Sequence, residues 1–317
     1  MSIWADRKHA TAKSAKTLPA LEGTLVSIYP INTGYLCVSR ASLVEGGSPN
    51  EILQIPCFAF LLHHPVEGFV LFDIGIPSRF LPDEDLAERK MKPDSPRFFP
   101  TVTKGMNVNS QLAQAGIESL DKVILSHSIS KDDLIDLMHL PTNSISVGVG
   151  MKLKLISRKD YGTDLDRKLI ETNFDTGRTL GAGRLSALGP FERTIDMYGD
   201  GSIYLVDLPG PCEGHMGILT RTEGSWVLLP GLAIYLRENY QRLLGKGKPI
   251  WKEKPTEDKK ATWNTITVIA EYASMPDTKV YASYEPALLE ELGDQFLLQD
   301  FAKRTSGYWQ YVAPDTK

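Results

Sequence analysis

Two histidines, His127 and His215, are the residues of this sequence best placed to do chemistry. His127 follows an apolar run over 123–125 and one serine, and His215 ends a glycine-rich loop. Imidazole exchanges protons near neutral pH and also binds metal ions, so both positions suit acid/base or metal chemistry. Lys131 and Asp132 add two charged groups shortly after His127. We therefore expect a site where these two segments of the chain meet.

Nucleophilic catalysis is a weaker interpretation of the same residues. Cys212 and His215 would supply a nucleophile and a base, but both lie in one loop and no third group that would orient the histidine can be identified. Ser128 or Ser130 paired with His127 has no stronger support. Proton transfer is therefore favoured over a covalent intermediate.

The elements that must position these residues are short apolar strands and a few helices. Residues 55–62 and 69–72 predict a hairpin whose second arm ends at Asp73, followed by a turn at Gly75. An acid at the end of a buried strand is a common way of building a site beneath a loop. A helix is expected over 132–140 because its apolar residues recur at helical spacing. Further strands are expected at 24–29, 35–39, 123–125, 144–149, 202–208, 217–222, 226–229 and 280–282, and helices at 265–273 and 288–301.

Three segments are expected to contribute little to the core. Residues 1–20 are polar, mildly basic and unlike a secretory signal, and they predict a flexible tail before a single domain over 21–317. Residues 157–200 are polar, glycine-rich and poorly periodic, which predicts an excursion over the surface or a lid. Residues 236–263 are highly charged and are interpreted as a second insertion that is partly helical.

Bulk composition narrows the class of protein. The formal net charge of −4 argues against a nucleic-acid partner. No uninterrupted apolar stretch is long enough to span a membrane. The three cysteines are few and far apart, so a disulfide framework is not expected, and the absence of an Asn-x-Ser/Thr sequon adds to the prediction of a cytoplasmic protein. These features favour a cytoplasmic protein with a small-molecule substrate; they do not indicate an oligomeric state.

The order of the elements predicts the fold class. Hairpins come first and strand–helix alternation follows, which is typical of an α/β domain with two sheets between helices rather than one doubly wound parallel sheet. A dinucleotide-binding fold would need a glycine-rich turn after a strand. The one candidate, Gly181–Ala182–Gly183, lacks the third glycine and the preceding strand.

Five blocks of this chain, in the same order, resemble the metallo-β-lactamase superfamily, particularly its lactonase-like branch and its fungal members. The resemblance covers roughly residues 24–290. The matching blocks are 60–65 with 71–75, 123–127, 199–215, 227–231 and 282–286. The resemblance implies a four-layer αββα sandwich. It also implies that Asp73 orients neighbouring loops.

The resemblance also implies where metal ligands should stand. In the superfamily, imidazoles and carboxylates hold two divalent ions that acidify a bridging water. Of these positions, His127 and His215 keep the family's residue. Ile129 replaces an imidazole and Leu232 replaces the bridging carboxylate, and a hydrocarbon has no lone pair to donate. Tyr284 replaces the last histidine, and a phenol with a pKa of about 10 is a poor ligand at neutral pH.

Two charged residues complete the comparison. Lys131 replaces an acid, and Asp132 replaces a histidine. We therefore expect no dinuclear centre and no cofactor. One zinc or other divalent ion held by His127, His215 and Asp132 is the alternative, which Lys131 opposes unless it points away or forms an ion pair. A further alternative is that both histidines are simply packed and hydrogen-bonded at strand ends.

A concave pocket at the strand ends is expected to survive without metal, because it comes from the fold. Tyr235 lies at the spacing where the superfamily's lactonases place a substrate-contacting tyrosine, although it would equally pack under the charged insertion. The expected catalytic side chains are His127, His215, Tyr235, Tyr284, Asp132 and Lys131. The expected substrate contacts are Ser128, Ser130, Cys212, Glu213 and Leu232.

These residues lead to three hypotheses for function. The first is an enzyme of small-molecule, secondary metabolism that has lost its metals and applies acid/base residues to a lactone-, ester- or polyketide-like substrate. The second is a mononuclear metal-dependent lactonase or esterase. The third is a non-catalytic ligand-binding protein.

Overall fold

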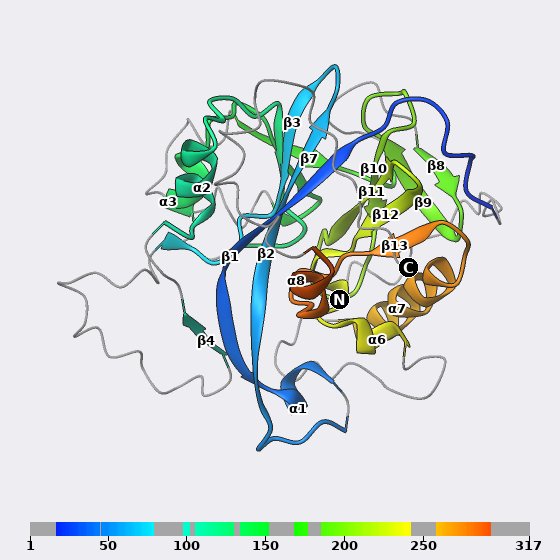
Figure 1. The fold of residues 1–317 in the computed structure, drawn as a ribbon. Helices are drawn as coiled ribbons and strands as arrows, with labels where there is room; N and C mark the ends of the chain where they lie inside the picture. Colours follow the sequence, from blue (N-terminus) through cyan, green and yellow to red (C-terminus); the bar gives the residue numbers. More distant parts are fainter. Residues whose placement is uncertain are drawn as a thin grey trace.

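The computed structural model describes residues 17–44, 46–78, 98–101, 105–129, 134–151, 168–176, 185–241 and 258–292. Within these residues two β-sheets pack against each other, and helices cover their outer sides (Figure 1). This is the four-layer αββα sandwich predicted from the sequence, so the expected fold class is confirmed.

The first sheet has seven strands among the described residues, in the order β4-β1-β2-β3-β5-β6-β7. Neighbours from β4 to β3 are antiparallel, and neighbours from β3 to β7 are parallel. The strands are β1 (Ser27–Ser39), β2 (Ile52–His64), β3 (Gly68–Phe72), β4 (Phe98–Thr101), β5 (Lys122–Ile124), β6 (Ile145–Gly148) and β7 (Leu169–Thr172).

The second sheet has six described strands, in the order β13-β12-β11-β10-β9-β8. All its neighbours are antiparallel except β12 and β13, which run parallel. The strands are β8 (Leu185–Leu188), β9 (Phe191–Asp196), β10 (Ile203–Asp207), β11 (Met216–Thr222), β12 (Ser225–Leu229) and β13 (Thr278–Val280).

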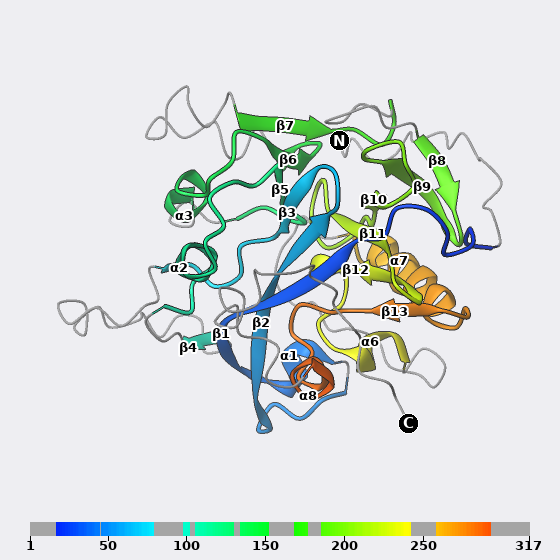
Figure 2. The ribbon, with the colours of Figure 1, turned by 45° about the horizontal axis from the view of Figure 1, so that its top comes forward.

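The helices form the two outer layers. On the first sheet lie α2 (Val108–Gln114) and α3 (Leu134–Met138), while α7 (Lys259–Ala273) covers the second sheet (Figures 1 and 2). Asp258 caps α7 by accepting hydrogen bonds from the N–H groups of Lys260 and Ala261. The remaining short helices are α1 (Arg40–Leu43), η3 (Gly231–Ala233), α6 (Arg237–Gln241) and α8 (Ala287–Leu292).

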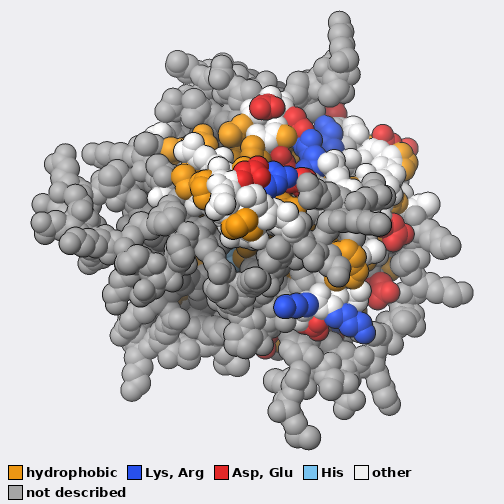
Figure 3. Space-filling view, turned by 90° about the horizontal axis from the view of Figure 1, so that it is seen from below, with side chains coloured by type: hydrophobic (Ala, Val, Ile, Leu, Met, Phe, Trp, Pro, Cys, Tyr) orange, Lys and Arg blue, Asp and Glu red, His pale blue; other side chains and the backbone are white. Residues whose placement is uncertain are grey.

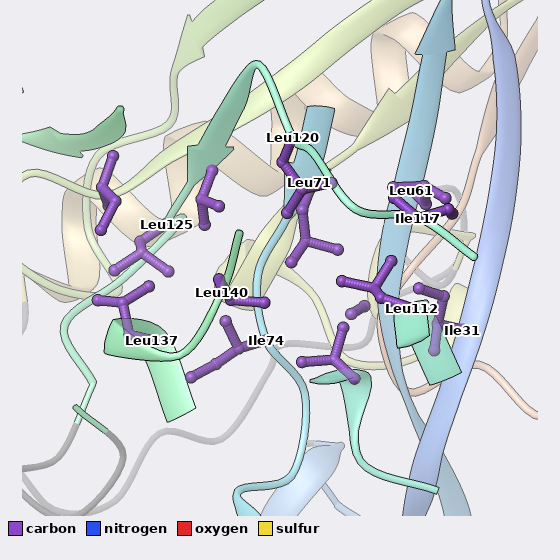
Figure 4. Close-up of a cluster of buried hydrophobic side chains, with 14 of the residues drawn as sticks. Ile31, Leu61, Leu71, Ile74, Leu112, Ile117, Leu120, Leu125, Leu137 and Leu140 are labelled. Carbon is purple, nitrogen blue, oxygen red and sulfur yellow. The ribbon is translucent and has the colours of Figure 1, made fainter. Parts of the chain in front are cut away.

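Strand β2 shows how one strand serves two layers of the core. Ala59 and Leu61 belong to the cluster packed under α2 and α3, part of which is drawn in Figure 4. Their neighbours Phe58 and Phe60 point to the other side and pack against the second sheet. Because both faces of β2 are buried, its sequence is a continuous apolar run instead of an alternating one.

Strand β1 differs from the sequence prediction. The sequence predicts two strands, at 24–29 and 35–39, with a turn at 32–34. The structure has one strand whose register shifts between Asn32 and Tyr35, so this prediction is wrong. A turn and a β-bulge use the same residue types, which is why the sequence does not distinguish them. The bulge turns Thr33 into the interior, where it is fully buried.

The segment 157–200 also differs from its prediction. Strands β7, β8 and β9 all lie in it and extend both sheets, so the expectation of a surface excursion or lid is wrong for these residues. Strand β8 is short and mostly exposed, and it therefore lacks the apolar pattern by which strands are recognised. The segments 152–167, 177–184 and 242–257 lie outside the described residues.

On the face seen in Figure 3, acidic and basic side chains are interspersed with hydrophobic ones. Within the described part of the chain, no helix has the length and hydropathy needed to cross a membrane.

Candidate functional site

The candidate site lies where strands of both sheets end at the same edge of the sandwich. Asp73 follows β3, His127 follows β5, His215 precedes β11, and Leu232 follows β12. The N–H of Met216 donates a 3.0 Å hydrogen bond to the carbonyl oxygen of Ser126, joining the two sheets at this edge. The architecture therefore brings together segments that are far apart in the sequence.

Asp73 occupies a backbone conformation that few side chains adopt. Its φ is 58°, in the left-handed region, and its side chain is largely buried. Two steps later, Gly75 has a φ of 65°, and a Cβ there would lie 2.1 Å from Oγ1 of Thr33. Thr33 holds this turn by accepting a 2.8 Å hydrogen bond from the N–H of Ile76 and donating one to the carbonyl of Cys57. The turn after β3 is thus fixed so that the Asp73 carboxylate faces β5.

The Asp73 carboxylate is connected to His127 through Ser126. Oδ1 of Asp73 accepts a hydrogen bond from the N–H of Ser126 (2.8 Å), and Oδ2 accepts one from the Ser126 hydroxyl (2.7 Å). The Ser126 oxygen lies 2.7 Å from Nδ1 of His127. The direct distance from Nδ1 to Oδ1 of Asp73 is 3.9 Å, too long for a hydrogen bond. Ser126 is therefore the link between the acid and the imidazole.

His215 has both ring nitrogens occupied. Nδ1 lies 2.7 Å from the carbonyl oxygen of Leu208, and a carbonyl can only accept, so Nδ1 carries the proton. Nε2 accepts a 3.1 Å hydrogen bond from the N–H of Leu232. Burial, with a smaller effect of His127, lowers the pKa of His215 to about 3. His215 is therefore a neutral, buried imidazole at physiological pH.

The backbone of the η3 loop fills the space beside His215. Gly231 has a φ of 56°, and a Cβ built on it would lie 2.5 Å from Cβ of Ser126 and 3.2 Å from Nε2 of His215. The Gly231–Leu232 peptide therefore lies between the two histidine-bearing segments, and the Leu232 side chain packs among the partly buried hydrophobic residues beside Tyr235.

A second group of titratable residues lies on the other side of Asp73. Tyr284 interacts with Cys57, Tyr235 and Asp73, and its pKa is raised well above 10, first by burial and then by these neighbours. The ring centroids of Tyr235 and Tyr284 are 5.2 Å apart. Burial also raises the pKa of Cys57 to about 12. Both phenol and thiol therefore stay protonated near neutral pH.

The loop before β11 lines a small pocket. Glu213 packs against Gly150, where a Cβ would lie 2.4 Å from its carboxylate carbon. Arg193 lies in the pocket and pairs with Asp175 and Asp207. The pocket is lined by Gly148, Val149, Thr172, Asn173, Phe174, Asp175, Arg193, Asp207, Pro209, Cys212, Gly214 and His215. Cys212 and Glu213 thus lie beside His215, as the sequence predicts for substrate contacts, although their roles stay predictions.

Some residues expected at the site lie outside the described residues. These are Ser130, Lys131 and Asp132, and the predicted ion pair of Lys131 lies there with them. Ser128 is described, and its hydroxyl oxygen is buried without a hydrogen-bond partner among the described residues. The structure places His127 near His215, and Tyr284 near Asp73 and Tyr235.

Three residues of this site are missing from the sequence prediction. Ser126 directly precedes His127 in the sequence, and this position is a signal that could have indicated it as a site residue. Cys57 stands in a continuous apolar strand and Thr33 in a bulge taken for a turn. Neither carries a pattern that would have indicated its place next to Asp73.

The described residues do not fit a pair of divalent ions. A metal-binding imidazole must offer a nitrogen lone pair, and the two nitrogens of His215 are already hydrogen-bonded. The side chains of Ile129 and Leu232 have no lone pair to give to a metal ion, and Tyr284 keeps its proton at neutral pH because its pKa is raised well above 10. In the described part of the chain, no group of three or more His, Cys, Asp or Glu side chains is arranged to hold an ion.

Known proteins that are similar in sequence or in structure identify the superfamily of this chain. No family model matches the sequence. The gamma-lactamase FDB1 of Fusarium pseudograminearum is 30% identical over 239 residues, which make up 68% of this chain and 54% of that protein. The metallo-hydrolase mfmC of Annulohypoxylon moriforme is 31% identical over 63% of this chain and 53% of that protein. The chain thus spans about half the length of these two curated relatives.

A third relative and solved structures agree with these two. The gamma-lactamase MBL2 of Gibberella moniliformis is 33% identical over 171 residues, 46% of this chain and 67% of that protein. An N-acyl homoserine lactone hydrolase, solved with N-hexanoyl-L-homoserine at its catalytic metal centre, superposes with a TM-score of 0.60 at 18% identity, covering 85% of this chain and 96% of that chain. AidC, a dizinc quorum-quenching lactonase, gives a TM-score of 0.51 at 12% identity, covering 85% and 91% of the two chains. The relatives and the shared fold show that this chain belongs to the metallo-β-lactamase superfamily.

Proposed function

We propose that this protein is an enzyme that opens a lactone-, lactam- or ester-like small molecule by acid/base chemistry at His127, without a dinuclear metal centre. The bond that we propose is broken joins the acyl carbon to nitrogen or oxygen, since two of the relatives are named gamma-lactamases. The observation that carries the metal-free part is the hydrogen bond from the Leu232 N–H to Nε2 of His215. A nitrogen whose lone pair accepts this bond is not available to a metal ion.

In the proposed reaction His127 acts as the base. Its Nε2 takes a proton from water, and the resulting hydroxide adds to the carbonyl carbon of the substrate. The tetrahedral intermediate then breaks its bond to the ring oxygen or nitrogen, and the imidazolium returns the proton to that leaving atom. A lactone gives a hydroxy acid, a lactam gives an amino acid, and an ester gives a carboxylic acid and an alcohol, with one water consumed in each case. Tyr284, which stays protonated, is the proposed hydrogen-bond donor of the site.

The decisive experiment measures metal content and turnover on the same full-length protein. The protein is purified without chelators or added metal, its zinc, manganese, iron, cobalt and nickel are quantified, and hydrolysis of a panel of γ-lactones, γ-lactams and aryl esters is assayed. We expect turnover with far less than one ion per chain, unchanged by EDTA. A stoichiometric ion whose removal abolishes turnover would show instead a mononuclear metal hydrolase, the class that the name of one relative, the metallo-hydrolase mfmC, favours.

A pair of histidine variants tests the role of His127. His127→Ala is expected to lower kcat by about 100-fold or more, the usual contribution of a positioned base. His139→Ala is the matched control, because His139 is exposed just after α3, on the outer layer of the first sheet. Equal turnover by wild type and H127A would exclude His127 as the base. A bound compound that is never converted would show a ligand-binding protein.

A further inference from the structure

We propose that Ser126 is a positioning residue that transmits the orientation of the Asp73 carboxylate to His127, holding the imidazole in the tautomer with the proton on Nδ1. The inference rests on the proposed function for its catalytic consequence, because only this tautomer leaves Nε2 free to act as a base. The tautomer itself is a property of the protein that can be measured without any substrate.

The direction of the hydrogen bonds follows from the number of protons. The Ser126 hydroxyl has one hydrogen, and it is donated to Oδ2 of Asp73. The same oxygen lies 2.7 Å from Nδ1 of His127, so this second bond needs its proton from the imidazole. Nδ1 is therefore the protonated nitrogen of His127, and Nε2 carries the lone pair.

The Ser126 oxygen is held in place from both sides. The residue is fully buried, its N–H donates to Oδ1 of Asp73, and its carbonyl accepts from Met216 of the second sheet. Asp73 is fixed in turn by its left-handed backbone and by its own N–H, which donates to the carbonyl of Ile124 (2.9 Å). The hydroxyl thus has one arrangement that satisfies all of its neighbours.

His127 and His215 share this tautomer but not its consequence. In His215 the Nε2 lone pair is taken by the N–H of Leu232, and the ring is buried. The side chain of His127 is 26% exposed, and no hydrogen bond to its Nε2 is found within the described part of the chain. Of the two imidazoles, His127 is therefore the partly exposed one, and its Nε2 accepts no hydrogen bond from the described residues.

Asp73→Asn is the sharpest test because it should reverse the direction of both hydrogen bonds made by the Ser126 hydroxyl, the one to residue 73 and the one to His127. Asparagine tolerates a left-handed backbone as well as aspartate does, so the turn should be kept. Its amide carbonyl can accept from the Ser126 N–H, while its NH2 donates to the Ser126 oxygen. The hydroxyl proton then turns towards Nδ1 of His127, which must accept, and the ring proton moves to Nε2.

The measurement is nitrogen NMR of the full-length protein labelled with 15N-histidine, at pH 8. Wild type is expected to show Nδ1–H at His127, D73N the Nε2–H form, and S126A a mixture of both forms. His215 is the internal control, since its tautomer is set by the Leu208 carbonyl and should be Nδ1–H in all variants. Ser146→Ala is the matched serine control, because Ser146 is as buried as Ser126 but its hydroxyl is paired with Thr172 on the neighbouring strand.

The kinetic readout is a loss of kcat of about 10- to 100-fold in S126A, typical for removing the partner that orients a functional histidine, with KM nearly unchanged. S146A should keep the wild-type values. An Nε2–H ring in wild type, or an Nδ1–H ring at His127 in both D73N and S126A, would overturn the inference. A correct tautomer pattern combined with turnover that does not depend on His127 would refute the proposed function alone.

Discussion

The backbone N–H of Leu232 donates a hydrogen bond to Nε2 of His215, at 3.1 Å. The resemblance to the superfamily implies a carboxylate that bridges two metal ions at the position of Leu232. It implies a metal-binding histidine at the position of His215. In this chain the two positions are joined directly, through a peptide group. The resemblance implies that these two positions are linked by a metal ion, whereas in this protein a direct hydrogen bond links them.

The burial of His215 predicts how the stability of the fold depends on pH. The pKa of His215 is about 3 in the folded state, compared with about 6.5 when unfolded. Between these values only the unfolded state binds the proton, so the free energy of unfolding falls as the pH drops below about 6.5 and is constant above it. We expect urea unfolding to give a value about 2 kcal/mol lower at pH 5.0 than at pH 7.5 from this residue.

The control for this prediction is His215→Gln, which has no group titrating in that range. Its free energy of unfolding should be lower than that of wild type at pH 7.5, and the gap should narrow at pH 5.0. A wild-type slope that H215Q retains in full would mean that His215 is not the buried neutral group described here.

Part of this site could be predicted from the sequence and part could not. The sequence indicates His127, His215 and Tyr284 as candidates because they stand at positions that match the superfamily's ligand positions, and the order of the strands indicates the paired sheets. The acid/base role expected for His215 stays a prediction, and the hydrogen bonds at both of its ring nitrogens argue against it. Its partner is a backbone N–H, and every residue except proline has one, so no side-chain pattern reveals it.

The residues around Asp73 show a second limit. In the sequence, Cys57 is one more apolar position of β2. Its place near the Asp73 carboxylate follows only from the turn after β3 in the folded structure. Likewise Thr33 enters the interior through a bulge, which shifts side chains from one face to the other and cannot be told from a turn. Short edge strands such as β8 are not predicted from the sequence because they lack a buried face and therefore an apolar pattern.

The packing of Gly231 predicts a severe effect of a single methyl group. Gly231→Ala would place Cβ 2.5 Å from Cβ and 2.6 Å from Oγ of Ser126, at a φ of 56°. Backbone strain costs about 1–2 kcal/mol, and the clash adds about 1–3 kcal/mol. We expect urea unfolding to show a loss of about 2–5 kcal/mol. Gly224→Ala is the matched control, with a φ of 75° but no atom within 4 Å, and should lose only the strain. Equal losses in the two variants would contradict the tight contact.

The cysteines should differ in reactivity towards iodoacetamide. Cys57 is 5% exposed and its pKa is about 12, so at pH 8 it is a buried thiol and not the reactive thiolate. Cys37 and Cys212 are partly exposed. We expect mass spectrometry to find native labelling at Cys37 and Cys212 and labelling at Cys57 only after unfolding in urea. Native modification of Cys57 at the rate of Cys212 would contradict its placement beneath Tyr284.

Asp200 predicts a second pH dependence, in the acid range and at a different place in the fold. Burial opposes ionisation of its carboxyl, but hydrogen bonds from Ser202, His64 and Thr24 outweigh burial and lower the pKa to about 2. Nε2 of His64, the last residue of β2 before the hairpin turn, lies 2.9 Å from Oδ2 of Asp200, which joins the first sheet to the loop before β10.

A carboxyl whose pKa is lowered by folding stabilises the protein above the unfolded pKa of about 3.9, and this stabilisation disappears as the pH falls towards 2. Asp200→Asn should therefore lower the melting temperature at pH 6 and have a smaller effect at pH 2.5. Asp175→Asn is the control, because Asp175 pairs with Arg193 on another part of the surface.

The hairpin turn itself should also loosen in D200N, because His64 is buried and its Nδ1 accepts hydrogen bonds from the N–H groups of Val66 and Glu67. We expect faster amide hydrogen exchange at these two residues. Unchanged exchange at the turn would show that Asp200 does not hold His64 in place.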